Sequence, residues 1–162
     1  MPFANGSLAA VYLEHCFEHL DYETEALPLL RECFRCLAPS GVLRIVVPNA
    51  GRYLKLYASD SWEALAEQRP LIAEGSGYRD YFGSEKYTTR MQFINAVFRQ
   101  RGEHKYAYDE ETLAAAMRQA GFLDVREMAY GVSRDPLMAP DTPKRRTDSL
   151  YVEGAKSDAS AL

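Results

Sequence analysis

The sequence is poor in the features that mark several classes of protein. Its 162 residues include only three cysteines, an odd and small number that fits a reducing cytoplasm better than a disulfide scaffold. No apolar run approaches the roughly 20 residues of a membrane span, and no basic patch with an apolar stretch marks a signal peptide. The net charge of -4 argues against a protein that binds nucleic acid by neutralising phosphates. These absences predict a cytoplasmic domain that binds neither membranes nor nucleic acid.

What is present is the composition of an ordinary globular domain. Hydrophobic residues make up 47% of the chain and charged residues 26%, which excludes wholesale disorder. The length predicts a single domain over residues 1–155, with residues 156–162 as a flexible tail. Within it, the stretch 50–108 gathers most of the aromatic residues and is predicted to form a helical cover.

The first third of the chain predicts a strand, a helix and a second strand. Leu8–Glu14 is a short apolar stretch with little alternation, as expected for a strand that is covered on both faces. A helix capped by Thr24 follows and is predicted to end at the breaker cluster Ala38–Gly41. Gly41–Pro48 is the strongest strand in the sequence because it is β-branched and nearly all apolar. Strand, helix and strand within about forty residues predict a right-handed parallel crossover.

The last third predicts a capped helix and two more strands. Asp109 is placed to cap the helix, and Gly121 falls just beyond its end, where a left-handed residue commonly stands. Strands are predicted over Asp124–Tyr130 and Ser149–Glu153. The predicted fold class is therefore α/β, with a mixed sheet of about four strands and flanking helices.

Three blocks, in this order and spacing, resemble the C-terminal half of class I S-adenosylmethionine-dependent methyltransferases of the methyltransferase domain 11 type. The blocks are Glu18-His19-Leu20, the run Pro39–Pro48, and the stretch from Asp109 to Phe122. The likeness extends from Pro2 to about Glu153. It implies a partial Rossmann-like fold that contains the family's strands four to seven, with the last two strands as an antiparallel edge pair.

The resemblance also implies S-adenosyl-L-methionine as cofactor, with part of its site absent from this sequence. The family holds the cofactor on a Gly-rich turn after its first strand, and no G-x-G-x-x-G occurs here. Gly75-Ser76-Gly77 comes nearest but follows no predicted strand, and Ala9 stands where the family often has aspartate. We expect another copy or a partner chain to cover the exposed edge of the strand Leu8–Glu14. A start upstream of Met1 is the other explanation of the missing half.

The resemblance places candidate site residues at the exit of the strand Leu8–Glu14 and in the aromatic stretch. It implies His15 and Glu14 as catalytic residues, with His15 as general base. The implied cofactor-binding residues are Pro2, Phe3 and Glu14, and the candidate residues for a small-molecule or sugar-type acceptor are Tyr53, Tyr57, Tyr81 and His104. The alternative function is a non-catalytic remnant of the fold used in binding or assembly.

A distant alternative is a zinc hydrolase. His15-Cys16-Phe17-Glu18-His19 spells H-x-x-E-H, which on a helix places two histidines on one face for zinc. The residues before His15 are predicted to form a strand, so no metal ligands are predicted. The pair Cys33 and Cys36 lies in the middle of a predicted helix and is expected to be packed rather than reactive.

Overall fold

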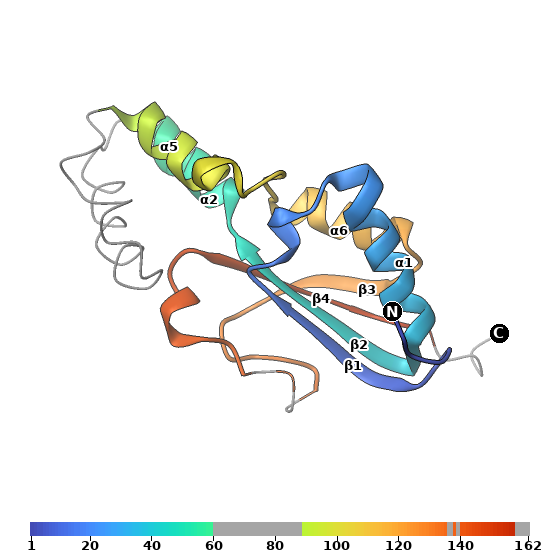
Figure 1. Cartoon of the computed structure of the whole chain (residues 1–162). Helices are drawn as coiled ribbons and strands as arrows, with labels where there is room; N and C mark the ends of the chain where they lie inside the picture. The colour runs from blue at the N-terminus through green and yellow to red at the C-terminus, as the bar shows by residue number, and fades with distance from the viewer. Residues whose placement is uncertain (60–88, 136–137, 139, 158–162) are drawn as a thin grey trace.

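The computed structural model describes residues 1–59, 89–135, 138 and 140–157 and shows one four-stranded sheet (Figure 1). The strands are β1 (Leu8–Glu14), β2 (Leu37–Pro48), β3 (Leu123–Met128) and β4 (Ser149–Ala155). They lie in the order β1-β2-β4-β3, with β1 parallel to β2 and β4 antiparallel to both of its neighbours. This arrangement confirms the predicted α/β class, the parallel crossover and the antiparallel pair of strands at the far edge.

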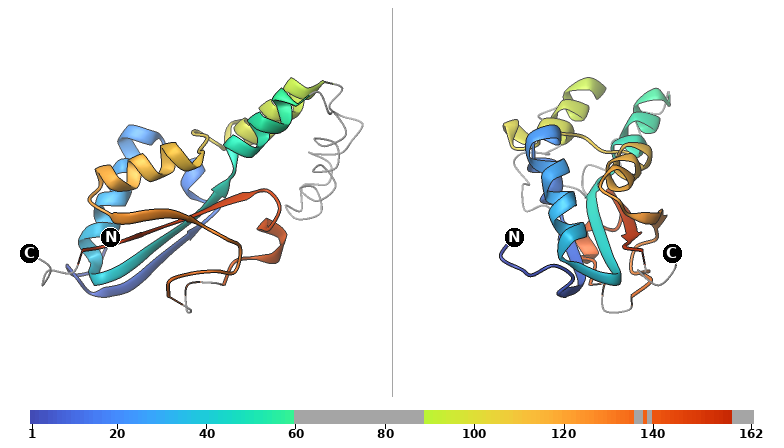
Figure 2. Two further views of the ribbon diagram at one scale, coloured as in Figure 1. Left: turned by 180° about the vertical axis from the view of Figure 1, so that it is seen from behind. Right: turned by 90° about the vertical axis from the view of Figure 1, so that its right-hand side faces the viewer.

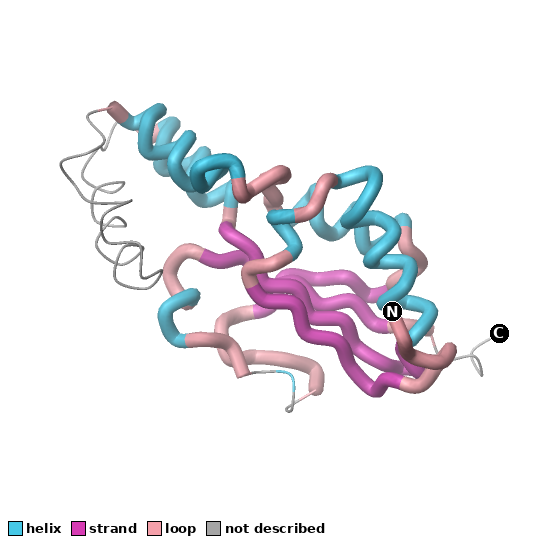
Figure 3. Tube along the Cα trace, in the orientation of Figure 1, coloured by secondary structure: helices cyan, strands magenta, loops and turns pink. Residues whose placement is uncertain are grey.

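Two helices cover one face of the sheet. These are α1 (Leu27–Cys36), which joins β1 to β2, and α6 (Glu110–Gln119), which precedes β3 (Figures 1 and 3). The apolar side chains of both helices pack on the inward residues of the strands, among them Leu43, Ile45 and Val152. Among the described residues this cluster is the larger of two apolar cores.

A second pair of helices extends from the end of the sheet where β1 and β2 finish. These are α2 (Ala50–Ala58) and α5 (Arg90–Arg99), which pack against each other (Figure 2). Tyr53 and Phe93 are buried in the small core between them. The backbone of Ala50 donates to the carbonyl of Tyr108 at 2.9 Å, which ties the start of α2 to the segment before α6.

The opposite face of the sheet carries a buried charged network. Arg44 of β2 is fully buried and donates to Asp141 and to Glu153 of β4. Arg44 Nη1 also donates to the carbonyl of Val132 at 3.0 Å, so the segment between β3 and β4 is held on this face. An alternating strand directs successive side chains to opposite faces, which explains why the same strands carry a core and a polar network.

The ends of α6 agree with the sequence prediction. Asp109 caps the helix by accepting a hydrogen bond from the backbone of Thr112 at 2.9 Å. Gly121 has φ +105°, and the amide of Phe122 returns to the carbonyl of Met117 at 3.1 Å. These are the contacts of a left-handed helix C-terminus.

The ends of the first helical segment differ from the prediction. The cap is Asp21, not Thr24: its carboxylate accepts from the backbone and hydroxyl of Thr24, and a π-turn over Tyr22–Ala26 leads into α1. The cluster Ala38–Gly41 lies inside β2, which already begins at Leu37. Ser40 takes a left-handed φ of 61°, at an irregularity of β2 between Leu37 and Val42, and the strand resumes beyond it.

The burial of β1 also differs from the expectation. Its residues are half-buried rather than covered on both faces. Among the described strands β1 pairs with β2 alone, and its other edge has no strand beside it. No helix within the described residues is long and apolar enough to cross a membrane.

Candidate functional site

The candidate site lies where the parallel strands β1 and β2 end. His15 follows β1 with a left-handed φ of 47°, and its amide donates to the carbonyl of Val46 at 2.8 Å. The chain then turns through a short 3-10 helix, Phe17–His19, instead of continuing as an α-helix. The carboxyl ends of parallel strands are where open α/β sheets bind ligands.

Glu18 is the centre of this region. It is 2% exposed, and neither oxygen of its carboxylate has a hydrogen-bond partner among the described residues. Its Oε1 lies 3.3 Å from Nδ1 of His15, 4.0 Å from Nε2 of His19 and 3.9 Å from Nε2 of His104. The sequence contains three histidines, and all three therefore surround this single carboxylate.

The electrostatics of the cluster favour a charged Glu18 beside a neutral His104. Burial raises the pKa of Glu18, but the polar contact with His15 and the nearby imidazoles outweigh it, and the net pKa is lowered. Burial lowers the pKa of His104, against the opposing pull of Glu18. The rings of His19 and His104 are nearly perpendicular, at 86°, with a centroid distance of 4.9 Å.

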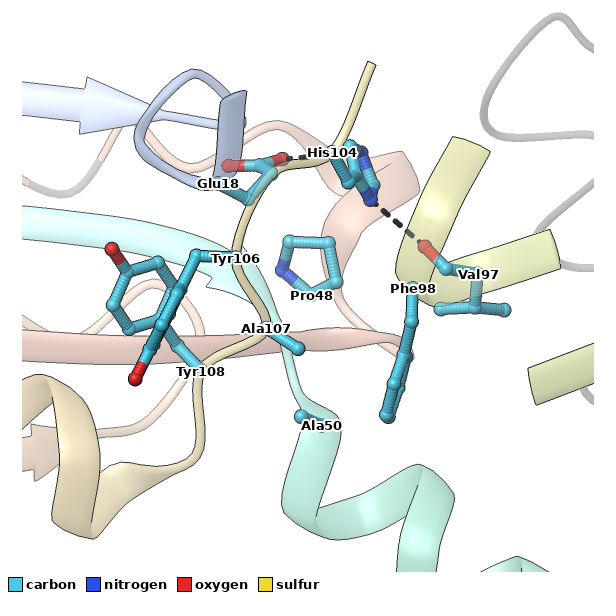
Figure 4. A pocket seen from close by; sticks show the side chains of 9 residues that line it. All are labelled: Glu18, Pro48, Ala50, Val97, Phe98, His104, Tyr106, Ala107 and Tyr108. Atoms are coloured by element: carbon cyan, nitrogen blue, oxygen red, sulfur yellow. Dashed lines mark hydrogen bonds and ion pairs between the residues drawn. The ribbon is translucent and has the colours of Figure 1, made fainter. Parts of the chain in front are cut away.

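The partners of the ring nitrogens fix the proton positions of two histidines. Nδ1 of His104 lies 2.8 Å from the carbonyl oxygen of Val97, and Nδ1 of His19 lies 3.1 Å from that of Glu103. A carbonyl only accepts, so each Nδ1 carries a proton, and in the neutral ring each Nε2 is left with a lone pair. Figure 4 shows His104 between the Val97 carbonyl and the Glu18 carboxylate.

His15 is oriented from the other side by β4. Its Nε2 lies 2.7 Å from Oγ of Ser149, whose hydroxyl donates to Asp148 at 3.0 Å. Because that hydroxyl proton is directed to Asp148, Nε2 of His15 is the donor to Ser149. Burial raises the pKa of Asp148, although His15 and Ser149 pull in the opposite direction.

A pocket of about 190 Å³ opens beside the cluster. Its wall includes the three histidines, Glu18, and the side chains of Glu103 and Arg145. A second, much smaller hollow shares Glu18 and His104 with this pocket. Its other lining residues are drawn in Figure 4: Pro48, Ala50, Val97, Phe98, Tyr106, Ala107 and Tyr108. Glu18 and His104 therefore line both a mainly apolar hollow and a polar pocket.

Of the predicted site residues, the structure brings His15 and His104 together around Glu18. Glu14 precedes them on β1, but its carboxylate accepts from the backbone and hydroxyl of Thr142, the latter at 2.7 Å. That contact holds the segment before β4 against the face of the sheet that carries Arg44.

Pro2 and Phe3 lie at the other end of β1. Both are exposed, and the carbonyl of Phe3 accepts from Arg35 near the end of α1. Glu14 ends β1, which spans about 20 Å at roughly 3.3 Å per residue, whereas Pro2 and Phe3 precede the start of this strand. The described residues therefore do not bring Pro2 and Phe3 together with Glu14, and by themselves they do not complete the S-adenosylmethionine site that the resemblance implies.

The predicted aromatic residues are dispersed. Tyr53 is 1% exposed and packs edge-on against Phe93 in the small core. Tyr57 lies beside it on α2, with the guanidinium of Arg90 5.8 Å from its ring centroid. Tyr81 lies outside the described residues, as does Gly75-Ser76-Gly77.

Sequence reasoning missed Glu18 as the centre of the site, and also Arg145 and Ser149. The H-x-x-E-H motif is a local signal for His15, Glu18 and His19, but the third histidine, His104, lies far along the chain. Ser149 begins β4, and only the sheet order places it beside His15.

Comparisons with known proteins agree with the fold. Residues 1–45 match the family model described as "Methyltransferase domain". The solved structure of the S-adenosylmethionine-dependent methyltransferase SibL is 14% identical, with 97% of this chain and 33% of SibL covered and a TM-score of 0.52. A possible exported protein from Bordetella parapertussis is 15% identical, with 96% and 41% covered and a TM-score of 0.52. A protein from Nostoc punctiforme, described as an O-methyltransferase candidate, is 15% identical, with 95% and 33% covered and a TM-score of 0.50.

The chain thus has the fold of a class I S-adenosylmethionine-dependent methyltransferase domain, as the sequence resemblance predicted. It spans 33% to 41% of the length of these three proteins. No curated protein sequence matches it.

Proposed function

We propose that this chain is the acceptor side of an S-adenosylmethionine-dependent methyltransferase that acts on a small-molecule or sugar-type acceptor. The observation that carries the proposal is the position of His15, which lines the pocket at the carboxyl end of the parallel pair β1 and β2. Because Nε2 donates to Ser149, the nitrogen that would act as general base toward an acceptor in the pocket is Nδ1, which lies beside Glu18. Ser149 and Asp148 hold the ring in one orientation.

The cofactor would be held mainly by polypeptide beyond the four described strands. This sequence contains no G-x-G-x-x-G, and Pro2, Phe3 and Glu14 are not assembled by the described residues. We expect the additional polypeptide to lie along the free edge of β1. That edge leaves backbone groups without a strand partner, and each such group costs about 1–3 kcal/mol when it is buried unpaired.

The proposal about the edge is tested by light scattering together with hydrogen exchange. A partner chain or second copy predicts an assembly larger than one chain and slow exchange of the β1 amides. A stable monomer whose outward β1 amides exchange freely contradicts it.

The proposal about the acceptor side is tested by a nuclear magnetic resonance titration of the ¹⁵N-labelled chain with S-adenosylmethionine. We expect weak, saturating shifts at Glu14, His15 and Asn49, because these residues end the two parallel strands. The matched control monitors the amides at the start of the same two strands, such as those of Leu8 and Leu37, whose chemical shifts should not change. No shift at the first group would contradict the proposal.

That negative result would favour the alternative function, a non-catalytic domain used in binding or assembly. One observation speaks for the alternative: the carboxylate of Glu14 is already bound by Thr142. The Glu14→Gln variant separates the two proposals. If Glu14 contributes to cofactor binding, the chemical-shift changes caused by S-adenosylmethionine become smaller in the variant. If Glu14 only holds the segment before β4, these changes remain and the free energy of unfolding falls.

A further inference from the structure

We propose that Glu18, His19 and His104 form a binding site for a zinc ion. The relevant ligand atoms are one carboxylate oxygen and the two Nε2 atoms, which all lie within 4.8 Å of one another. The site goes beyond methyl transfer and does not depend on it. It also differs from the H-x-x-E-H pattern, because His104 takes the place that a second histidine of one helix would have.

The first support is the direction of the two imidazoles. Each ring donates its Nδ1 proton to a backbone carbonyl, that of Val97 for His104 and that of Glu103 for His19. Metal-binding histidines usually have such a partner, which fixes the ring and leaves the other nitrogen free to coordinate. Here both free nitrogens point toward the same carboxylate.

The second support is the state of that carboxylate. Glu18 is 2% exposed, and within the part of the chain that the structure describes neither of its oxygens has a hydrogen-bond partner, although buried acceptors are almost always paired. Lone pairs of His19 and His104 facing an anionic oxygen across about 4 Å repel each other unless a cation lies between them. A divalent ion there would satisfy all three groups at once.

The chemistry of the ligands selects the metal. Two imidazole nitrogens and one carboxylate form a set that zinc uses in open sites, whereas magnesium and calcium prefer oxygen alone. Zinc bonds of about 2.0–2.2 Å in tetrahedral geometry place ligand atoms about 3.3–3.5 Å apart. The distances from Glu18 of 3.9 and 4.0 Å need to contract by about half an ångström. His19 can supply its part of this movement because its side chain is 34% exposed, and the buried pair Glu18 and His104 must supply the rest by side-chain rotation.

Three protein ligands leave a fourth position that faces the pocket of about 190 Å³. Arg145 lines the same pocket, so the ligand class expected at this position is a small anion or a carboxylate, with water in its absence. His15 lies 3.3 Å from Glu18 and would stand beside the ion.

The experiment uses the full chain, stripped with a chelator and titrated with zinc chloride in a calorimeter. We expect one zinc per chain and a thermal midpoint that rises with zinc concentration. The His19→Gln variant tests the ligand that is most exposed and least needed for folding, and Glu18→Gln tests the central one. Each should lower the affinity at least about tenfold.

Cys16→Ser is the matched control, because Cys16 is exposed, lies inside the same short segment and is the thiol nearest to the cluster in sequence. It should bind zinc as the parent does. Cobalt(II) substitution gives a second readout: tetrahedral d–d absorption without a thiolate charge-transfer band. Absence of zinc binding by the folded parent would overturn the proposal. So would binding that survives His19→Gln and Glu18→Gln but is lost in Cys16→Ser.

Discussion

The guanidinium of Arg44 forms two hydrogen bonds with the carboxylate of Asp141, from Nε to Oδ1 at 2.9 Å and from Nη2 to Oδ2 at 2.5 Å. Both side chains are fully buried, and Glu153 adds a third bond at 2.8 Å. This pair joins the middle of the sheet to the segment between β3 and β4. That segment also carries Thr142 and Arg145, so the pair positions one wall of the candidate site.

Removal of one partner of this pair should be strongly destabilising. In Asp141→Asn the guanidinium of Arg44 loses a charged partner while it stays buried, and we expect the free energy of unfolding to fall by about 3–5 kcal/mol. Urea denaturation followed by circular dichroism measures it. Arg126→Gln, which removes an exposed guanidinium on β3, is the control and should leave the midpoint unchanged. Equal midpoints for the two variants would contradict this interpretation.

The same pair predicts how stability depends on pH. Burial raises the pKa of Asp141, but Arg44 and the backbone N–H of Gly131 outweigh it and lower the net pKa. A lowered pKa in the folded state stabilises the protein above the unfolded value of about 3.9, and this is lost as the pH falls through the folded value.

The parent should therefore lose stability as the pH falls below about 4, and Asp141→Asn should lack this part of the slope. Two neighbouring groups remain in both proteins and so do not contribute to the difference between them. Tyr12 donates to Asp141, and Glu153 accepts from Arg44. Parallel stability curves over this acid range would show that Asp141 is not held by Arg44.

Removal of the N-terminal cap of α6 should lower the free energy of unfolding by less than removal of Asp141. Asp109→Ala removes the acceptor for the amide of Thr112 and should lower the free energy of unfolding by about 0.5–2 kcal/mol. Asp109→Ser keeps an acceptor at the cap and should recover most of the loss. Thermal or urea unfolding of the two variants decides this, and an unchanged Asp109→Ala protein would contradict it.

Close packing between β4 and α6 predicts that Gly154 does not tolerate a methyl group. A Cβ at this position would lie 2.9 Å from Cε of Met117 and 3.0 Å from Cβ of Phe122. Gly154→Ala should be destabilised by about 1–3 kcal/mol. Met117 has a flexible end, so adding Met117→Ala should cost less in Gly154→Ala than in the parent. Strictly additive losses in this double-mutant cycle would rule out the contact.

Local sequence patterns predict the strands and the capped helix. The differences between prediction and structure arise from contacts between residues that are distant in sequence. The strand Leu8–Glu14 and the ends of α6 at Asp109 and Gly121 follow from patterns within a few residues. By contrast, Ala38–Gly41 contains breaker residues, yet they lie inside β2 as an irregular stretch between two positions that pair with β1, Leu37 and Val42, because tertiary contacts override local propensity.

The candidate site was predicted in part for the same reason. The resemblance placed His15 at the end of β1, and its geometry there agrees with that placement. The surroundings of Glu18 depend on two residues that are distant in sequence. His104 lies beside the Glu18 carboxylate, and Ser149 orients His15, which contacts Glu18. No local pattern links these residues, so only the assembled sheet and helices reveal that the histidines converge.

The most direct test of the central claim is calorimetric titration of the purified chain with S-adenosylmethionine. The claim is that these four strands provide the acceptor-binding side of the site, while further polypeptide is needed to bind S-adenosylmethionine. We predict that the single chain shows no tight, saturable heat of binding. Tight uptake of one cofactor per chain by the monomer would contradict it.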